Sequence, residues 1–460
     1  MQNNSNQMSS SFRDPSGFCF YMNGSLYRQI NAVYKENYDH LMTSGLYGRL
    51  VEENLLIPHV EGDKDLSEQT EIYKIIHPEF ILFISYPYEW CFSQLKNAAL
   101  TTLKIQKIAL DYGMTLKDAS AYNIQFIDNK PVLIDTLSFE KYQEGKPWIA
   151  YRQFCQHFLA PLALMSLTDV RLSQLLRVYI DGIPLDLASK LMPKNSWLKV
   201  SLLSHIHLHA KSQKHFADRP VNIKKQKISK LSLLGIINSL EKAIKKLNWS
   251  PKGTEWADYY EDTNYSRDAL EHKKALLNEY LEIIKPKTVW DLGANTGLFS
   301  RLASSKGIQT ISFDVDPAAV EKNYIECAWR KETHLLPLII DLTNPSSSLG
   351  WANEERISLI ERGPADMIFA LALIHHLAIS NNLPFNNIAS YFSKLCKYLV
   401  IEFVPKEDSK VQKLLLTRED IFQNYTKQVF EKAFERFFSI ESNDRLKDSE
   451  RVLYLMRTLL

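Results

Sequence analysis

The sequence predicts an α/β fold for residues 251–460, preceded by a domain of mixed helices and strands. Three observations support this prediction. Short apolar runs alternate with helical patterns towards the C-terminus, which favours a mostly parallel sheet with right-handed crossovers. A loop containing two glycines follows the first of these apolar runs. The chain ends in two apolar runs with no helical pattern between them, which predicts an antiparallel hairpin at one edge of the sheet.

The predicted elements of this domain follow one another at short intervals. A helix is expected over 266–284, where apolar residues recur every three or four positions, with further helices over 297–305 and 318–330. The predicted strands are 288–292, 310–314, 335–340, 365–371, 398–403, 437–441 and 451–457.

Composition limits the class of protein. A chain of 460 residues exceeds one typical domain, so we expect two or three. The net charge of +2 gives no overall field that would attract nucleic acid. The five cysteines form no Cys-x-x-Cys pair, which argues against a zinc knuckle or a disulfide framework. A signal-peptide pattern and a run of about 18 apolar residues are both missing. We therefore expect a cytoplasmic protein without a membrane span.

The first half of the chain divides into three segments. Residues 1–12 are rich in Asn, Gln and Ser, which predicts a disordered tail. Residues 13–210 are expected to form an α+β domain. Residues 211–250 are the most basic stretch, interpreted as a linker with a connecting helix over 231–247. Its lysines are interpreted as a solvated face rather than as a nucleic-acid site.

The glycine loop carries the strongest signal for a ligand. The apolar strand has Asp291 as its next-to-last residue, and the loop after it has Gly293 and Gly297, so the spacing is Asp-x-Gly-x-x-x-Gly. Glycine lets the backbone approach a ligand closely and adopt unusual dihedral angles. The spacing differs from the Gly-x-Gly-x-x-Gly fingerprint that accommodates a pyrophosphate. A nicotinamide cofactor is therefore disfavoured.

Acidic residues follow the next two predicted strands. Asp314 ends the second strand, where a carboxylate can accept both hydroxyl groups of a ribose, and Asp316 is close enough to substitute. Asp341 follows the third strand and is placed to meet an adenine amino group. Each of these residues alone could instead be a turn former at a strand end.

These features, in this order, resemble class I S-adenosylmethionine-dependent methyltransferases. The resemblance covers roughly residues 250–460 and implies a Rossmann-like sheet of seven strands with a terminal antiparallel strand. It also implies S-adenosylmethionine as the cofactor. The residues that match the family motifs are Asp291, Gly293, Gly297, Asp314 and Asp341, while Asn295 stands where many members have a small residue or Cys.

Two histidines follow the fourth predicted strand. A hydroxyl acceptor of the methyl group would need a general base, and His375 or His376 is positioned for that role. The alternative, that one histidine packs and the other caps a helix, stays open. The Asn-Pro-Pro-Tyr type of motif that the family uses for amino groups is missing. A hydroxyl on a glycan or a small metabolite is therefore the expected acceptor.

A second pattern lies in the N-terminal half. Asp118 and Asn123 precede a predicted hairpin that ends at Asp135. In phosphoryl transfer such an Asp orients the acceptor, and the Asn with the second Asp holds Mg²⁺. The stretch resembles the catalytic and metal loops of protein kinases and aminoglycoside phosphotransferases. It departs from them at Leu116, where His is usual, and at Thr136, where Phe is usual.

The sequence alone leaves three functions open. The first is a methyltransferase whose kinase-like half, degenerate as an enzyme, helps select or hold an unidentified acceptor. The second is a bifunctional enzyme with an active ATP-dependent kinase-like domain. The third is a non-catalytic scaffold in which both folds are degenerate. Asp118 and Asn123 could also be only loop and cap residues. No metal site is expected from the histidines His205, His207 and His209, because no cysteine or acidic cluster lies nearby.

Overall fold

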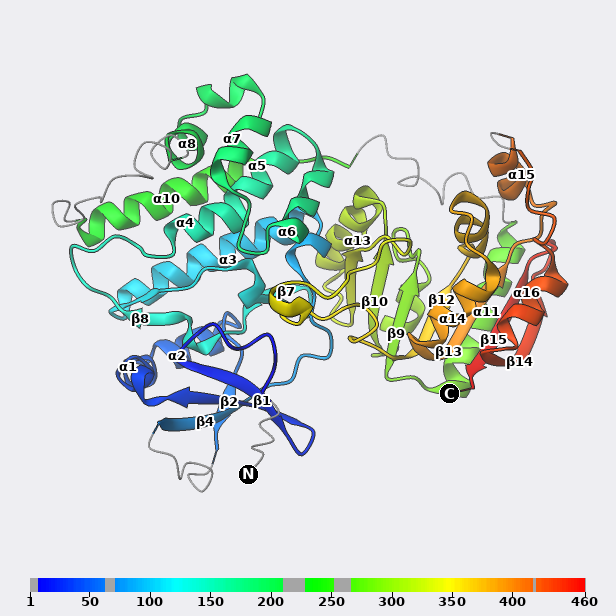
Figure 1. Cartoon of the computed structure of the whole chain (residues 1–460), viewed down its shortest axis with the longest axis horizontal. Coiled ribbons are helices and arrows are strands. Elements are labelled where there is room, and N and C mark those ends of the chain that lie inside the picture. Colours follow the sequence, from blue (N-terminus) through cyan, green and yellow to red (C-terminus); the bar gives the residue numbers. More distant parts are fainter. Residues whose placement is uncertain (1–6, 63–70, 210–227, 252–265, 417–418, 460) are drawn as a thin grey trace. The chain divides into compact units, whose positions relative to one another are not determined.

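The computed structural model divides into two compact units (Figure 1). It describes residues 7–62, 71–209, 228–251, 266–416 and 419–459. Unit 1 comprises Met1–Ser250 together with Leu349–Arg356, and unit 2 comprises Pro251–Ser348 and Ile357–Leu460. In the described ranges, the helices lack the combined length and hydropathy needed to cross a lipid bilayer.

Unit 2 is built on a seven-stranded sheet of order β11-β10-β9-β12-β13-β15-β14. The strands are β9 (Thr288–Leu292), β10 (Gln309–Asp314), β11 (Leu335–Ile339), β12 (Ala365–Ala370), β13 (Cys396–Phe403), β14 (Phe438–Arg445) and β15 (Val452–Thr458). The first five are parallel, and β15 lies antiparallel between β13 and β14. This is the sheet that the resemblance to class I methyltransferases implies, and the predicted terminal hairpin is confirmed.

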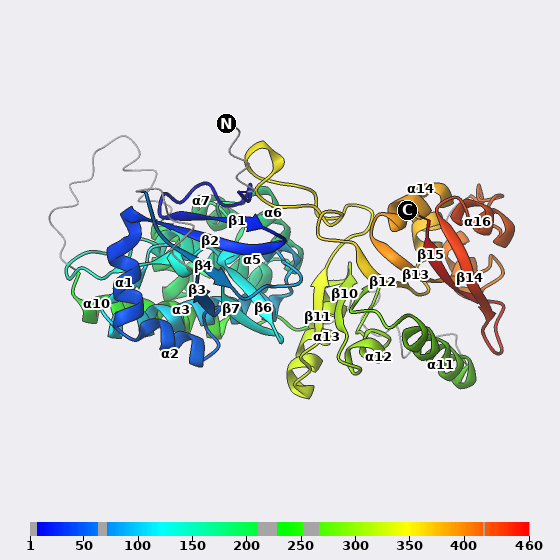
Figure 2. The same cartoon turned by 90° about the horizontal axis from the view of Figure 1, so that it is seen from below.

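Helices cover both faces of this sheet. Figure 2 shows α11, α12 and α13 on one side and α14 and α16 on the other. The helices are α11 (Arg267–Ile284), α12 (Ser300–Ser304), α13 (Pro317–Arg330), α14 (Phe385–Ser393), α15 (Ser409–Leu415) and α16 (Lys427–Phe434). The helix expected over 297–305 is shorter than predicted, because Gly297 has a φ of 79° and continues the loop.

Helix α11 shows how the sequence pattern produces the packing. The Ser266 side chain caps its first turn by accepting a hydrogen bond from the Ala269 backbone N–H, 3.0 Å away. Leu277 and Leu281, four positions apart, face the sheet and join a buried core with Val289 of β9 and Phe369 of β12. The first strand of the sheet is therefore anchored by the helix that precedes it.

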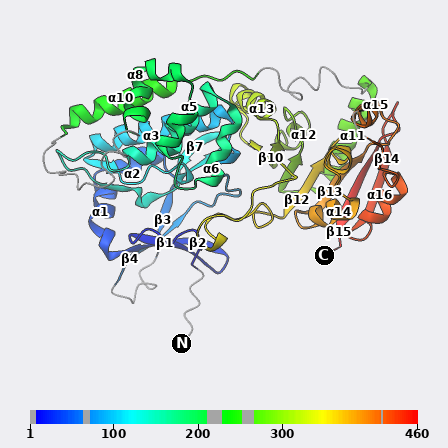
Figure 3. The ribbon, with the colours of Figure 1, turned by 45° about the horizontal axis from the view of Figure 1, so that its top comes forward.

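Unit 1 combines a small antiparallel sheet with a helical part (Figure 3). The sheet has the order β1-β2-β4-β3, with β1 (Gly17–Met22), β2 (Ser25–Asn31), β3 (His59–Glu61) and β4 (Ile72–Pro78). Two further strand pairs are β5 (Met114–Leu116) with β8 (Phe139–Lys141), and β6 (Ile124–Ile127) with β7 (Lys130–Leu133). The predicted hairpin after residue 123 is therefore confirmed.

The helices of unit 1 surround a long central one. They are α1 (Lys35–Thr43), α2 (Leu46–Glu52), α3 (Phe92–Asp111), α4 (Tyr151–Phe154), α5 (Ala160–Leu167), α6 (Leu175–Val178), α7 (Leu185–Leu191), α8 (Val200–Leu202) and α10 (Lys230–Lys246). Helix α3 buries Leu95, Leu103 and Leu110 among other residues.

Two segments differ from the sequence expectation. Residues 7–12, expected in a disordered tail, pair with β1, since the Met8 N–H donates to the Cys19 carbonyl at 2.9 Å. Helix α10, expected to connect the domains, packs on α3 and belongs to unit 1. It buries Leu233, Ile237 and Leu240 on one face and leaves its lysines on the other. Residues 1–6, 210–227 and 252–265, parts of the expected tail, linker and C-terminal domain, lie outside the described residues.

Candidate cofactor site

The strand order of unit 2 reverses next to β9. The chain passes from β9 to β10 and β11 on one side, and then crosses to β12 and β13 on the other. In an open α/β sheet the loops at such a switch point diverge, and ligands bind in the crevice at the carboxyl ends of the strands. The loops after β9 and β12 therefore border the expected ligand site.

The loop after β9 folds back tightly onto β10. The backbone N–H groups of Gly293 and Ala294 both donate to the Phe313 carbonyl at 2.9 Å. Gly293 and Gly297 have φ values of 77° and 79°, which residues with a Cβ atom rarely adopt. A Cβ atom at Gly297 would lie 2.6 Å from Nδ2 of Asn323. Both glycines are thus required by the shape of the turn.

Asp314 ties this turn to the end of β10. Its Oδ2 accepts a hydrogen bond from the Asn295 N–H at 2.7 Å, and its Oδ1 accepts one from the Asp316 N–H at 2.9 Å. Asn295 itself has a φ of 51°, a conformation that Asn tolerates better than most residues. Burial raises the pKa of the Asp314 carboxyl to about 6, despite these hydrogen bonds.

Asp316 and Asp291 support the same turn from two sides. One oxygen of Asp316 caps α13 by accepting from the Ala318 N–H at 2.8 Å, while the other is buried without a hydrogen-bond partner among the described residues. Asp291 is 2% exposed and accepts from the Ser300 hydroxyl at 2.6 Å. Burial raises the pKa of Asp291 to about 6 as well. This residue joins the end of β9 to α12.

Asp341 lies beyond the end of β11 and is exposed. Its Oδ1 accepts from the backbone N–H and the hydroxyl of Thr343, at 2.8 and 2.7 Å. The neighbouring Ile340 N–H donates to the Asp314 carbonyl at 2.9 Å. The structure therefore places the predicted acids of β10 and β11 at adjacent strand ends.

The histidine pair follows the loop after β12, at the start of a helical segment that continues as a π-helix over His376–Ser380. His375 is 1% exposed, and neither ring nitrogen has a hydrogen-bond partner among the described residues. The His375 and His376 ring centroids are 4.2 Å apart. Burial, with the nearby Arg451 cation, lowers the pKa of His376 to about 4. Burial and the neighbouring His376 hold the pKa of His375 well below its usual value. Both imidazoles are therefore neutral near pH 7, as a general base requires.

The sequence did not reveal a group of buried charges near these histidines. Glu402, at the end of β13, accepts hydrogen bonds from Lys273 Nζ of α11 at 2.6 Å and from the Ala372 backbone N–H at 2.9 Å. Arg451, just before β15, pairs with Glu402 at 3.4 Å and with Asp408 at 2.8 Å. The only signal in the sequence is a single acidic residue inside the apolar run YLVIEF.

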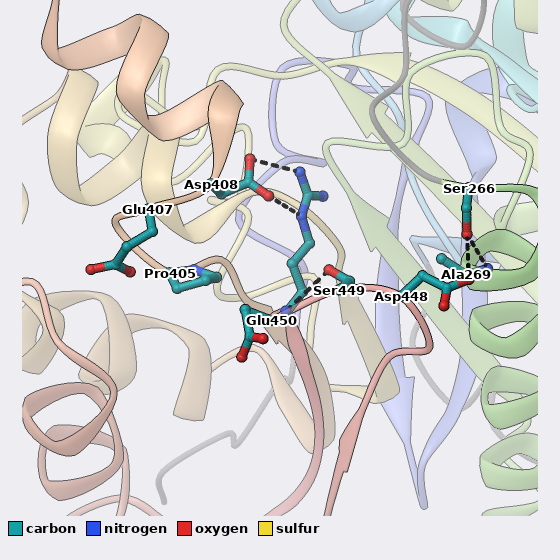
Figure 4. Close-up of a pocket in the computed structure, with 9 residues that line it drawn as sticks. Ser266, Ala269, Pro405, Glu407, Asp408, Asp448, Ser449 and Glu450 are labelled. Carbon is teal, nitrogen blue, oxygen red and sulfur yellow. Dashed lines mark hydrogen bonds and ion pairs between the residues drawn. The ribbon is translucent and has the colours of Figure 1, made fainter.

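A pocket of about 200 Å³ opens beside this group (Figure 4). Arg451 in its wall donates to Asp408 at 2.8 Å. Figure 4 shows the Ser266 side chain at the end opposite Asp408, where it is bonded to Asp448 at 3.1 Å. The wall is formed by the segment after β13, the turn between β14 and β15, and the start of α11. Strand β15 pairs antiparallel with β13, so the start of β15 lies beside the carboxyl end of β13. The turn that leads into β15 therefore lies at that end of β13.

In unit 1 the three kinase-like candidates come together. Asn123 donates to the Ser138 hydroxyl at 3.3 Å, and this hydroxyl donates to Asp135 at 2.6 Å. Burial, and then the Asp135 carboxylate, raise the pKa of Asp118. The sequence did not indicate Arg28 of β2, whose guanidinium contacts Asp135 at 2.6 Å. A cation from the protein thus occupies the position next to the carboxylate that was expected to hold Mg²⁺.

The histidines of the segment 205–209 have partners within the protein. His205 contacts the hydroxyl groups of Tyr151 and Ser239 at 2.7 and 2.9 Å. His207 contacts those of Ser189 and Ser196 at 2.7 and 3.0 Å. The part of the chain that the structure describes contains no group of three or more His, Cys, Asp or Glu side chains able to hold a metal ion.

Comparisons with known proteins give one relative over the full length. The nodulation protein NoeA of Rhizobium meliloti (strain 1021) is 33% identical over 456 residues, which cover 97% of this chain and 95% of that protein. A scan of protein-family models gives no match.

Solved structures similar to part of the chain include two methyltransferases. Magnesium protoporphyrin IX methyltransferase (ChlM) from Synechocystis PCC 6803, solved with bound SAH, is 15% identical. It covers 45% of this chain and 91% of its own, with a TM-score of 0.30. The N-methyltransferase NodS from Bradyrhizobium japonicum WM9 is 12% identical and covers 42% of this chain and 98% of its own, also with a TM-score of 0.30.

Proposed function

The chain belongs to the family of the nodulation protein NoeA, and we propose that it is an S-adenosylmethionine-dependent methyltransferase. We propose that unit 2 binds the cofactor and that unit 1 helps select or hold the acceptor. The acceptor we favour is a hydroxyl group of a glycan or a small metabolite.

One observation carries the proposal for the cofactor. At the switch point, the glycine turn after β9 and the half-buried Asp314 carboxylate form one unit, joined through the Asn295 N–H. The turn approaches a ligand with backbone alone, because Gly293 and Gly297 have no side chains. The carboxylate keeps lone pairs for a ribose diol, since each oxygen accepts one backbone N–H. This donor and acceptor set fits an adenosine without a pyrophosphate.

Three of the predicted acids then have a task in binding. Asp314 accepts the ribose hydroxyls, and Asp316 supplies a second, buried acceptor beside it. Asp341 accepts from the adenine amino group at the next strand end. Asp291 does not face solvent and instead holds α12 against the turn. S-adenosylmethionine, when bound, supplies a methyl group already activated by its sulfonium.

The remaining work of the protein is alignment and proton removal. His375 and His376 stand at the start of the helical segment after β12, and we place them at the border of the crevice because ligands bind at the carboxyl ends of such strands. Their depressed pKa values keep both rings neutral near pH 7 but also make each ring a weaker base, so proton removal has to accompany methyl transfer rather than precede it. We assign this role to His375, because its ring nitrogens have no partner among the described residues.

Calorimetry on the full chain tests the proposal. Titration with S-adenosylmethionine and with S-adenosylhomocysteine should give a single site per chain for each ligand. Mass spectrometry of candidate glycans and metabolites incubated with the protein and cofactor should then show the mass gain of one methyl group. Absence of binding of both ligands would contradict the proposal and favour the non-catalytic scaffold.

Cofactor affinity should decrease as the pH falls below about 6. The pKa of Asp314 is raised from 3.8 to about 6 in the free protein. A diol donates to the charged carboxylate, so binding favours the ionised form. The free protein must therefore lose a proton to bind at low pH, and affinity should fall about ten-fold per pH unit below 6.

Calorimetry with S-adenosylhomocysteine between pH 5 and pH 8 measures this dependence. Asp314→Asn cannot ionise, so its weaker binding should be nearly independent of pH in this range. A wild-type affinity that stays constant across the range would contradict the assignment of Asp314.

The bifunctional alternative depends on Asp135, and it makes a different prediction from ours. Arg28 and Asp135 are only 12% and 14% exposed and pair with each other. Asp135→Ala leaves the guanidinium without this partner, so unit 1 should lose about 3 kcal/mol of stability. Denaturant unfolding checks this, with Arg28→Met/Asp135→Leu as the control that should recover most of the loss.

An active kinase would in addition show a Mg²⁺-dependent ATPase signal that disappears in Asp135→Ala.

A further inference from the structure

Glu402 belongs to a group of buried charged side chains and also contacts the loop after β12. The residue is fully buried at the end of β13. Its Oε2 accepts hydrogen bonds both from Lys273 Nζ, at 2.6 Å, and from the Ala372 backbone N–H, at 2.9 Å. Burying such a pair costs desolvation free energy, and apolar residues of similar size often give equal stability. The charges are therefore poorly explained by stability alone.

The bond to Ala372 fixes the loop where its backbone is unusual. Ala372 has a φ of 50°, in the left-handed region, which costs a residue with a Cβ about 1 kcal/mol. The next residue, Leu373, packs directly on the glycine turn, because a Cβ atom at Gly293 would lie 3.2 Å from its Cδ1. His375 and His376 follow at once along the chain.

Charges of both signs balance around Glu402. Lys273 and Arg451 are the cations, and Glu402 and Asp408 are the anions. The Lys273 ammonium also lies 4.4 Å from the centroid of the Phe299 ring, in the segment after the glycine turn. Arg451 makes two further contacts with Asp408, at 2.8 and 3.1 Å, so it keeps a partner when Glu402 is changed.

We propose that Glu402 is a positioning residue that sets the loop 371–376 over the Gly293 turn through its hydrogen bond to the Ala372 N–H. The inference rests on the proposed function, since the turn it shapes is the proposed cofactor site. Glu402 does not contact the ligand. It acts through Ala372 and Leu373, and it holds the two histidines at the edge of the crevice.

Two matched double variants isolate this hydrogen bond. Lys273→Met/Glu402→Gln and Lys273→Met/Glu402→Leu carry the same charge, and both leave Arg451 paired with Asp408. Only the Gln variant keeps an oxygen that can accept from the Ala372 N–H. Glu402→Asp is a third variant, which keeps every charge but shortens the side chain by one methylene and should weaken the same bond.

Two measurements on the full chain decide the matter, with S-adenosylhomocysteine as the probe. The Leu variant should bind it about ten-fold more weakly than the Gln variant. In the absence of ligand, amide hydrogen exchange of a peptide covering 371–376 should be faster in the Leu variant, and Glu402→Asp should lie between wild type and the Leu variant. Global unfolding midpoints should be similar for the two double variants.

Equal affinity and equal exchange in the two double variants would overturn the proposal and leave Glu402 as a structural ion pair only. If wild type fails to bind S-adenosylhomocysteine, the proposed function fails instead. The exchange comparison needs no ligand, so it still confirms or overturns the positioning role in that case.

Discussion

Replacing Asp314 by asparagine is expected to lower the affinity for S-adenosylmethionine by about 100-fold, the loss of one or two hydrogen bonds to a charged acceptor. The asparagine side chain has one acceptor oxygen in place of two, while the backbone N–H groups of Asn295 and Asp316 both require one. The variant therefore loses the charge that favours a diol, and it also loosens the turn after β9. Calorimetry with the cofactor measures the effect.

Asp366 gives a matched control in the same sheet. It lies in β12 near the opposite, amino edge, and its Oδ2 accepts from the backbone N–H groups of Lys287 and Thr288, at 2.9 and 3.2 Å. Asp366→Asn should lower stability by a similar amount and leave cofactor affinity unchanged. Equal affinities for Asp314→Asn and wild type would remove Asp314 from the proposed site.

Gly293→Arg should eliminate measurable cofactor binding. A side chain at this position must adopt a left-handed φ of 77°, and its Cβ starts 3.2 Å from Leu373 Cδ1. We expect the arginine side chain to extend from the turn on the side where the backbone approaches the ligand. It would then fill the crevice. It would also place a positive charge beside the cationic sulfonium. Steric exclusion of this kind affects binding far more than a lost hydrogen bond.

Gly307→Arg is the control for backbone strain. Gly307 has nearly the same φ, 78°, but an added Cβ meets no atom within 4 Å. This variant should lose a similar small amount of stability and bind S-adenosylmethionine as wild type does. If both arginine variants bind normally, the glycine turn is not part of a cofactor site.

The regular part of unit 2 could be predicted from local pattern. Strands such as β9 and β12 are largely buried and mostly apolar, with one aspartate each, so their positions are visible in the sequence. The short helix α12 was predicted too long, because the residues around Gly297 have helical composition but a left-handed turn. Boundaries at a ligand loop depend on φ angles that apolar periodicity does not report.

The first strands of unit 1 were not predicted. Most residues of β1 and β2 are half-buried, so their sequence lacks a strict alternation of apolar and polar positions. The contact between β2 and Asp135 could not be predicted from local sequence either. Arg28 in β2 meets Asp135 only because the small sheet brings them together across the fold. No local pattern connects two residues so far apart in the sequence.

The acidic residues of the candidate site could be predicted from the sequence, but the buried ion pair that supports the site could not. Asp291, Asp314 and Asp341 could be singled out because each lies at or just beyond the end of an apolar strand, and the topology places these strand ends next to one another. Glu402 and Lys273 were missed, since one lies inside a strand and the other inside an amphipathic helix. Their pairing depends on how α11 packs on the sheet, which is information held in the tertiary structure.

Unit 1 is discontinuous in sequence, and this has a consequence for biosynthesis. The segment Leu349–Arg356 belongs to it, and the Arg356 guanidinium lies 4.2 Å from the centroid of the Tyr122 ring. On the ribosome, domains generally fold as they emerge, N-terminal first. Here the first half emerges without its last piece, which arrives only after β9, β10 and β11 have been translated. We therefore expect a gene fragment ending at residue 250 to yield an incompletely folded product, and the two halves to be inherited as one gene.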